Sequence, residues 1–390
     1  MTATRCLGID SLPASCAALF AAERNFSLGR AWLRNMIANG LPPGTRALFS
    51  VLLRDREAAA ILPLQSGAKG GLASLTNCYT CLFRPLIATG EHAGAIARRL
   101  GVEVGHLCAQ QSLVRIDCLP PEWPALGAFV DGLSSAGLAI RRFDHFGNWY
   151  EPIGGRTWQD YLAARPGHLR ELLRRRGRRM HRAGEVRFEI VATPEDLPRG
   201  IAAYEAVYRR SWKEPEPFPR FNAGLMQEAA REQALRLGIC WRGETPIAAQ
   251  LWIVAGSGAT VMKLAHDEAH RALSPGTVLT AEMIARLLQE GIEEIDFGRG
   301  DDPYKRLWAG QRRQRVGLLI VNPRRLPGLL TLCRHDLGRM VGSLRRRVGV
   351  SRAWPMPPAV ATGGQNRSLP RYRHGVDRLS PSPSEEFGTT

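Results

Sequence analysis

Lysine is nearly missing from this strongly basic sequence. Of its 390 residues 53 are basic and the formal net charge is +17, yet only four of the basic residues are lysines: Lys69, Lys213, Lys263 and Lys305. The arginines gather in residues 165–182 and 312–352, which hold eight and eleven of them against one acidic residue each. Such stretches are usually solvated faces, but they also suit phosphates, RNA or an anionic membrane surface. No basic strand is interleaved with aromatic residues, so stacking of RNA bases is not expected.

Several other signals are absent. No apolar run reaches the roughly 18 residues that span a bilayer, and residues 1–12 lack the apolar region of a signal peptide, which predicts a soluble, cytoplasmic chain. The eight cysteines are scattered, and the CxxC of Cys78 and Cys81 has neither a second pair nor histidines at ligand spacing, which predicts buried thiols and no metal. A GxSxG motif is also missing, which excludes a hydrolase of that type.

The order of the predicted elements indicates two related domains of α/β (α+β) class, each a mixed twisted sheet flanked by helices. In the first, a hairpin (46–53 and 58–64) precedes a helix (91–100), a strand (102–108), a helix (123–137) and a strand (139–143). The second runs through strands 186–191, 238–241, 247–254, 259–265 and 293–297, with helices 158–182, 195–212 and 276–290. We therefore expect a flexible segment 1–10, domains 11–155 and 156–325, a basic amphipathic helix 326–350 and a disordered tail 351–390.

One helix start stands out in the second domain. A strand ends near residue 265, a short loop follows, and Ser274-Pro-Gly276 opens the next helix. Serine, proline and glycine favour a helix N-terminus, and the N–H groups there, with Arg271 nearby, form a ready site for a phosphate. A well-capped helix without a ligand explains the same residues.

Polar side chains follow the next strand. Asp296 lies near the end of the predicted strand 292–297, and the loop beyond it carries Asp301, Asp302, Tyr304 and Lys305. The carboxyl ends of strands are where α/β folds place ligand sites. A local cluster of ion pairs with Arg299 and Arg306 is the alternative.

These two segments carry a resemblance to a known family. Residues 271–276 resemble the acyl-CoA signature of GNAT proteins, [QR]xxGx[GA], with Ser274 in place of the first glycine. Together with the segment IDFGRGDDPYKRLW they resemble the CelD/BcsL-like acetyltransferases, a group similar to the Fem-type aminoacyl transferases, which pair two GNAT-like domains. Further segments that look like this group are Asn148-Trp-Tyr150, residues 158–162, Ser211-Trp212-Lys213 and residues 246–252, so that the resemblance covers about residues 20–325.

The resemblance implies a donor site for acetyl-CoA or another acyl-CoA, without a metal. The pantetheine arm would lie between strands 259–265 and 293–297, and the backbone N–H near Leu264 would polarise the thioester carbonyl. The pyrophosphate would sit on the residues around the helix start: Arg271, Ser274, Gly276, Thr277 and Val278.

It also implies direct attack of an acceptor on the thioester. The base candidates are Asp296, Asp301 and His266, and the acid candidate is Tyr304. Asp296 has the structural alternative of pairing with Arg299, and His266 that of a surface loop residue. The residues expected to contact the acceptor are Lys305, Trp308, Trp212 and Lys213.

Further alternatives remain open. The acceptor is expected to be an amine or a sugar of a cell-envelope or exopolysaccharide precursor. Ser274 also fits another donor, such as the aminoacyl-tRNA of the Fem-type proteins, and a non-catalytic GNAT scaffold is the third reading. Helix 326–350 either lies on an anionic membrane or packs over the C-terminal domain.

Overall fold

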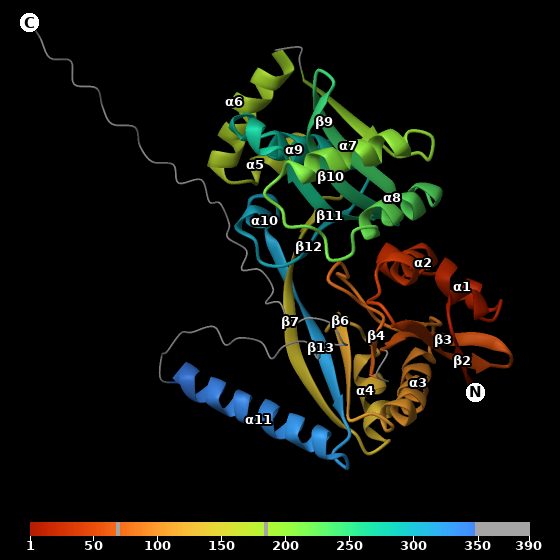
Figure 1. Cartoon of the computed structure of the whole chain (residues 1–390). Helices are drawn as coiled ribbons and strands as arrows, with labels where there is room; N and C mark the ends of the chain where they lie inside the picture. Colours follow the sequence, from red (N-terminus) through yellow and green to blue (C-terminus); the bar gives the residue numbers. More distant parts are fainter. Residues whose placement is uncertain (68–70, 183–185, 348–390) are drawn as a thin grey trace, which may run out of the picture.

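The computed structural model describes residues 1–67, 71–182 and 186–347 (Figure 1). The predicted tail 351–390 and the last residues of the predicted helix 326–350 lie outside this range. Within it, no helix has the length and apolar character needed to cross a membrane.

In the described residues, the N-terminal half contains seven strands, two of them short, and four α-helices. Its strands are β1 (Thr2–Cys6), β2 (Arg46–Arg54), β3 (Glu57–Ser66), β4 (Leu72–Ser74), β5 (Leu86–Ile87), β6 (Leu113–Leu119) and β7 (Ala139–Pro152). Its α-helices are α1 (Cys16–Ala21), α2 (Arg30–Asn39), α3 (Ala93–Cys108) and α4 (Leu126–Ser134).

The C-terminal half repeats this order. Its strands are β8 (Val186–Val191), β9 (Leu235–Arg242), β10 (Thr245–Ala255), β11 (Gly258–His266), β12 (Glu294–Arg299) and β13 (Gln311–Val321). Its helices are α5 (Trp158–Ala163), α6 (Gly167–Arg182), α7 (Leu197–Arg209), α8 (Phe221–Arg231), α9 (Pro275–Gln289), α10 (Pro303–Trp308) and α11 (Leu326–Arg347).

The two halves share one sheet, and their last strands are exchanged. The described strand order is β1-β2-β3-β4-β6-β13-β7-β12-β11-β10-β9-β8, with β5 paired to β3. β13, the last strand of the chain, lies between β6 and β7 of the N-terminal half, and β7 pairs with β12 of the other half. Figure 1 shows β7 and β13 as the long strands that connect the two bodies of the molecule. The predicted boundary at residues 155 and 156 therefore divides the sequence but does not separate two independent sheets.

A hydrophobic core also crosses between the halves. Trp32 of α2 and Phe221 of α8 are almost fully buried, and their rings meet edge to face at 5.5 Å between centroids. Residues of α1, α2 and β2 belong to the same buried cluster as residues of α7, α8 and β9. Because each half covers apolar surface of the other, we expect them to fold as one unit.

Some local predictions are wrong. Residues 2–6, expected to be flexible, pair with β2. Residues 102–108, expected to be a strand, continue helix α3, because Leu100, Val104 and Leu107 recur at helical spacing on its buried side. The close packing of α3 on α4 passes through glycines: a Cβ at Gly101 would lie 2.3 Å from the carbonyl oxygen of Phe129. The sequence analysis also missed β6 and most of β7.

Candidate functional site

Strands β11 and β12 pair at their beginnings and then part. Their parallel register holds only three pairs, Gly258 with Glu294, Ala259 with Ile295 and Thr260 with Asp296, although β11 runs on to His266 and β12 to Arg299. On its other edge β11 stays paired with β10 up to His266, with an irregularity in register between Leu251 and Trp252. A bulge bends its strand and increases the local twist. In the part of the chain that the structure describes, β11 therefore has an edge beyond Thr260 that β12 does not cover.

The parting of the two strands depends on Gly298. Its φ of +71° is a left-handed conformation that favours glycine, and a Cβ there would lie 3.0 Å from the carbonyl oxygen of Val261 and 3.5 Å from Sγ of Cys81. Lys305 holds the backbone just beyond, because its Nζ donates to the carbonyl oxygens of Arg299 (2.5 Å) and Gly298 (3.2 Å). Lys305 thus fixes the backbone at the end of β12. Its burial lowers the pKa of its ammonium group.

Helix α9 begins beside this divergence. Ser274 is in the left-handed region (φ 53°, ψ 46°), Pro275 follows, and Gly276 is buried. The side chain of Ser274 makes no capping hydrogen bond, and Val278 is the first residue of the helix whose N–H bonds back, to the carbonyl of Ser274 (3.1 Å). The N–H groups of Gly276 and Thr277 have no partner within the helix and remain for an anion.

Gln250 of β10, which was not among the predicted site residues, stabilises the start of α9. Its buried Nε2 donates to the carbonyl of Gly276 and to Oγ1 of Thr280, both at 2.8 Å. Its Oε1 accepts from Nε1 of Trp252 at 2.9 Å. Gln250 also pairs with Leu264, the predicted contact of the thioester, across β10 and β11. The polar side chain is therefore satisfied and fixes the first turn of α9 against the sheet.

His266 lies at the same helix start. A Cβ built on Gly276 would be 3.4 Å from its Nδ1, and the Trp212 ring is 4.5 Å away between centroids. Arg271 belongs to the short 3-10 helix Glu268–Leu273 between β11 and α9. His266 is therefore close to the expected phosphate site, at the far end of β11 from the three β11–β12 pairs.

Both aspartates predicted as bases are engaged by arginines. Oδ1 of Asp296 accepts from Nδ2 of Asn148 (2.6 Å) and from the N–H of Gly298 (2.7 Å), while Oδ2 accepts from Arg313 (2.5 Å). Asp296 therefore pairs with an arginine, as the structural alternative predicted, but this partner is Arg313 instead of Arg299.

Asp301 receives both Nε and Nη2 of Arg312, at 2.7 and 2.9 Å, as well as Nε1 of Trp149 at 2.9 Å. The hydrogen bond from Arg312 holds the pKa of the Asp301 carboxyl below its ordinary value. A carboxylate stabilised in this way is a poor proton acceptor.

Tyr304 presents a hydroxyl group to α9, whereas Trp308 belongs to the core. The hydroxyl of Tyr304 is 2.7 Å from Oγ1 of Thr280 in α9, and burial raises its pKa to about 12, so it keeps its proton at neutral pH. Trp308, predicted to contact a substrate, is fully buried in the C-terminal core, and its carbonyl oxygen accepts from Tyr161 and Arg165. Its position is therefore structural, whereas the ring of Trp212 is 46% exposed.

Lys213 is influenced by the charges of Lys263 and Lys305, and Lys263 binds a carboxylate, Glu216, that was not among the predicted site residues. Glu216 accepts from Nζ of Lys263 (2.7 Å) and from the hydroxyls of Tyr79 and Tyr208 (2.6 Å each). Burial and the charge of Lys263 lower the pKa of Lys213 to about 8, with Lys305 acting in the same direction. In a chain that otherwise uses arginine, this rarity of lysine is the signal that would have found the cluster.

The N-terminal half contributes Tyr79 to this cluster. Its strands β4 and β6 correspond to β11 and β12, but a segment of the chain lies along β6 where they part. β4 pairs in parallel with β6 over two pairs only, and residues 75–85 then run along β6, where the N–H of Phe83 donates to the carbonyl of Cys118 (3.0 Å). From the same segment Tyr79 reaches Glu216, and its ring lies 4.7 Å below Nζ of Lys263. Within the described residues, Cys78 and Cys81 belong to no group of three side chains that could bind a metal ion.

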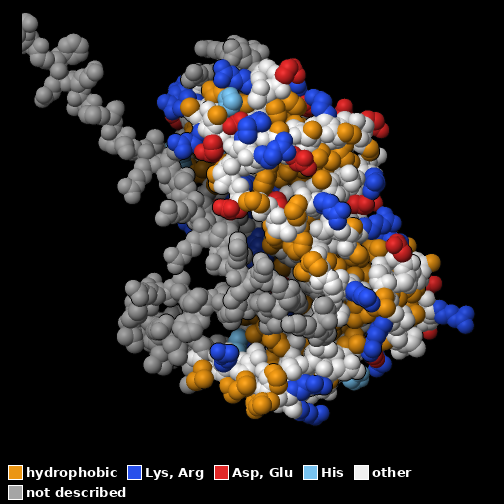
Figure 2. Space-filling view, viewed as in Figure 1, with side chains coloured by type: hydrophobic (Ala, Val, Ile, Leu, Met, Phe, Trp, Pro, Cys, Tyr) orange, Lys and Arg blue, Asp and Glu red, His pale blue; other side chains and the backbone are white. Residues whose placement is uncertain are grey.

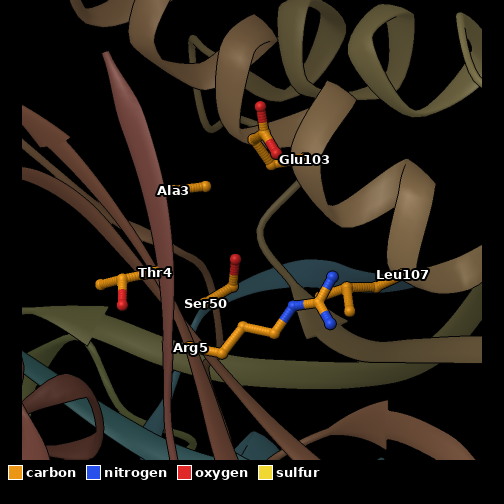
Figure 3. A pocket seen from close by; sticks show the side chains of 6 residues that line it. All are labelled: Ala3, Thr4, Arg5, Ser50, Glu103 and Leu107. Carbon is orange, nitrogen blue, oxygen red and sulfur yellow. The ribbon is translucent and has the colours of Figure 1, made fainter.

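A separate cavity of about 370 Å³ lies at the other end of the sheet (Figure 3). It is lined by residues of β1, β2 and α3: Ala3, Thr4, Arg5, Ser50, Glu103 and Leu107. No residue of the predicted site lines it, and β1 and β11 lie far apart in the strand order. The cavity is therefore separate from the β11–α9–β12 region that the sequence predicted.

Comparison with protein families identifies the class of this region. Residues 167–306 match the family model of an acetyltransferase (GNAT) domain, a range that includes β11, α9 and β12. The chain thus contains a GNAT-type domain and is an acyltransferase. None of the curated proteins compared with the sequence matches it.

Solved structures share the fold at low sequence identity. FemX has a TM-score of 0.57 at 10% identity over 83% of this chain and 98% of its own. A conserved protein of unknown function from Bacteroides thetaiotaomicron has a TM-score of 0.53 at 12% identity, covering 79% and 97% of the two chains. A tandem GNAT protein from the clavulanic acid biosynthesis pathway is similar at a TM-score of 0.44 and 13% identity, over 81% and 98%. The predicted α/β (α+β) class, a mixed sheet flanked by helices, is confirmed, although one sheet is shared by both halves.

Proposed function

We propose that the protein transfers an acyl group, in the first place acetyl, from acyl-CoA to an amine of an anionic acceptor. The observation that carries the donor assignment is the short pairing of β11 with β12 next to the uncapped start of α9. An unpaired strand edge offers hydrogen bonds to an extended pantetheine arm, and a helix start offers them to a diphosphate.

In this proposal the diphosphate lies on the N–H groups of Gly276 and Thr277, since the N–H of Val278 donates to the carbonyl of Ser274. The cation of Arg271 and the hydroxyl of Ser274 stand at the same turn, and His266 lines it from the side of Gly276. The backbone N–H near Leu264 polarises the thioester carbonyl.

The transfer is a direct displacement. The amine nitrogen of the acceptor forms a bond to the carbonyl carbon, the bond from that carbon to sulfur breaks, and Tyr304 gives its proton to the departing thiolate. The acceptor nitrogen loses its proton to water, because Asp296 and Asp301 are held in ion pairs. Tyr304 then regains a proton from solvent.

The lysine cluster supports an acceptor that carries a phosphate or carboxylate. Lys263 and Lys305 have carboxylate partners, Glu216 at 2.7 Å and Asp302 at 3.6 Å, whereas Lys213 lies 5.3 Å above the Trp212 ring. We propose that Lys213 and Trp212 contact the acceptor and that Tyr79 forms the N-terminal wall of its site. The resemblance to CelD/BcsL-like proteins suggests a cytoplasmic precursor of the cell envelope or of an exopolysaccharide.

Calorimetry and thermal shift with acetyl-CoA and longer acyl-CoAs test the donor. Gly276→Asp places a carboxylate where the diphosphate is proposed, and its Cβ fits at 3.4 Å from His266. We expect affinity to fall by about two orders of magnitude, because like charges then meet in the site.

The matched control is Gly94→Asp at the start of α3, where nothing lies within 4 Å of the new Cβ. It should bind acyl-CoA like the unchanged protein. Equal binding by the Gly276→Asp variant would remove α9 from the donor site.

Aminoacyl-tRNA is the second candidate donor. The similarity to FemX over most of both chains and the net charge of +17 support it. Transfer from charged tRNA, with affinity that falls steeply as salt rises, would establish this donor in place of acyl-CoA. A folded protein that binds neither donor would be a non-catalytic scaffold.

A further inference from the structure

Helix α11 rests on the N-terminal half by one side only. Leu332 is buried, and Gly328 packs so closely that a Cβ would lie 2.2 Å from the carbonyl oxygen of Asn322. Asp336 is tied to Arg141 of β7 by two hydrogen bonds of 2.9 and 2.8 Å. The prediction that this helix packs over the C-terminal domain is therefore wrong: it leaves the sheet at the end of β13 and contacts β13 and β6 (Figure 1).

The opposite side of α11 is apolar and exposed. Leu326, Leu329, Leu330 and Leu337 are 70%, 46%, 56% and 60% exposed, and they are most of the large hydrophobic side chains exposed in the described residues. With 3.6 residues per turn, these four positions fall within an arc of about 100°. Figure 2 shows the hydrophobic side chains together at the lower edge of the molecule, where α11 lies in Figure 1. We call this surface the leucine face.

Positive charge accompanies the leucine face. Arg324 and Arg325 precede the helix and Arg334 lies within it, and all three are exposed. The sequence of α11 contains five arginines and one acidic residue, Asp336, which is paired with Arg141. An apolar stripe with arginines beside it is the composition of helices that lie in the interface of an anionic bilayer.

We propose that the leucine face of α11 binds the surface of an anionic membrane, with its leucines among the acyl chains and its arginines at the lipid phosphates. A second copy of this chain fits less well, because two such faces would bring arginines against arginines. A nucleic acid would bind the arginines but would leave the leucines in water.

Co-sedimentation of the full chain with vesicles tests this proposal. We expect binding to vesicles of equal parts phosphatidylglycerol and phosphatidylcholine and little binding to pure phosphatidylcholine. Leu330→Glu and Leu337→Glu should each weaken binding by about tenfold or more, since a carboxylate replaces an inserted side chain. Both side chains are exposed, so the fold should be unchanged, which the acyl-CoA thermal shift checks independently.

The control is Leu7→Glu, the same change at a leucine that is 72% exposed and lies near the N-terminus. It should bind vesicles like the unchanged protein. Vesicle binding that survives both α11 substitutions would overturn the proposal. So would a dimer in light scattering that these substitutions convert to monomers without any vesicle binding by the unchanged chain.

Discussion

Replacing Gly298 by alanine tests whether the divergence of β11 and β12 binds the donor. The substitution has two costs: a left-handed backbone at φ +71°, and a Cβ 3.0 Å from the carbonyl oxygen of Val261. The backbone term is about 1–2 kcal/mol. The contact requires β11 and β12 to shift by a few tenths of an ångström, which we expect to add about 1 kcal/mol.

Gly243→Ala separates these two terms. Gly243 has φ +55° in the turn between β9 and β10, and nothing lies within 4 Å of a Cβ there. It should lose only the backbone term, about 1–2 kcal/mol in urea unfolding, and should bind acyl-CoA normally. Gly298→Ala should be less stable than this control and should lose donor affinity by about tenfold, because it alters the spacing of the two strands.

Donor affinity that is the same in both alanine variants would refute this reasoning. It would mean that the strands can move without effect on the ligand. The donor would then lie elsewhere than between β11 and β12, whatever the stability difference between the two variants.

Two further predictions concern protonation. Lys213 should titrate with a pKa of about 8, because burial and Lys263 disfavour its charge; with only four lysines in the chain, NMR of ¹³C-methylated lysines can resolve it, and the low-pKa signal should vanish in Lys213→Arg. His145, 3% exposed, has its pKa lowered to about 4 by burial. The unfolded chain therefore binds a proton near pH 6.5 that the folded chain does not, and stability should fall by up to about 3 kcal/mol as pH drops from 6.5 to 4. His145→Asn, whose Oδ1 can still accept from the N–H of Cys118, should show a smaller fall in urea unfolding; an unchanged pH dependence would contradict the burial of a neutral imidazole.

The sequence predicted best where the signal was local. Strands β8 to β12, helix α9 and its Ser274-Pro-Gly276 start follow from periodicity and helix-start chemistry, and their positions agree with the structure, whereas β13 was not predicted. Helix α3 was predicted as a helix followed by a strand, whereas it is one helix in which Gly101 and Gly105 serve close packing on α4. A residue that is small for tertiary reasons cannot be distinguished from a helix breaker by sequence alone.

The candidate site was predicted less completely because its contacts are long-range. Asp296 and Asp301 were selected for their place at the end of a strand, but their partners Arg313 and Arg312 belong to β13, which the exchange of strands places beside β7, one strand from β12. Glu216 lies in a proline-rich loop, and its partners include Lys263 and Tyr79, the latter more than a hundred residues away in the sequence. Such partners depend on topology, and a single sequence does not specify it.

Because the two halves exchange strands, side chains of one half hold residues of the other half in position. Asn148 on β7 donates to Asp296 on β12 and accepts from Arg313 on β13, so a buried polar network joins three adjacent strands from both halves. Removing one member of such a network leaves another buried and unpaired, which resists any sliding of β7 against β12. The segment 75–85 follows β4 and bonds to β6 of the N-terminal half, and it is thereby held at a fixed distance from β11. This supports the proposal that Tyr79 forms a rigid wall of the acceptor site, because the shared sheet fixes the relative position of the two halves.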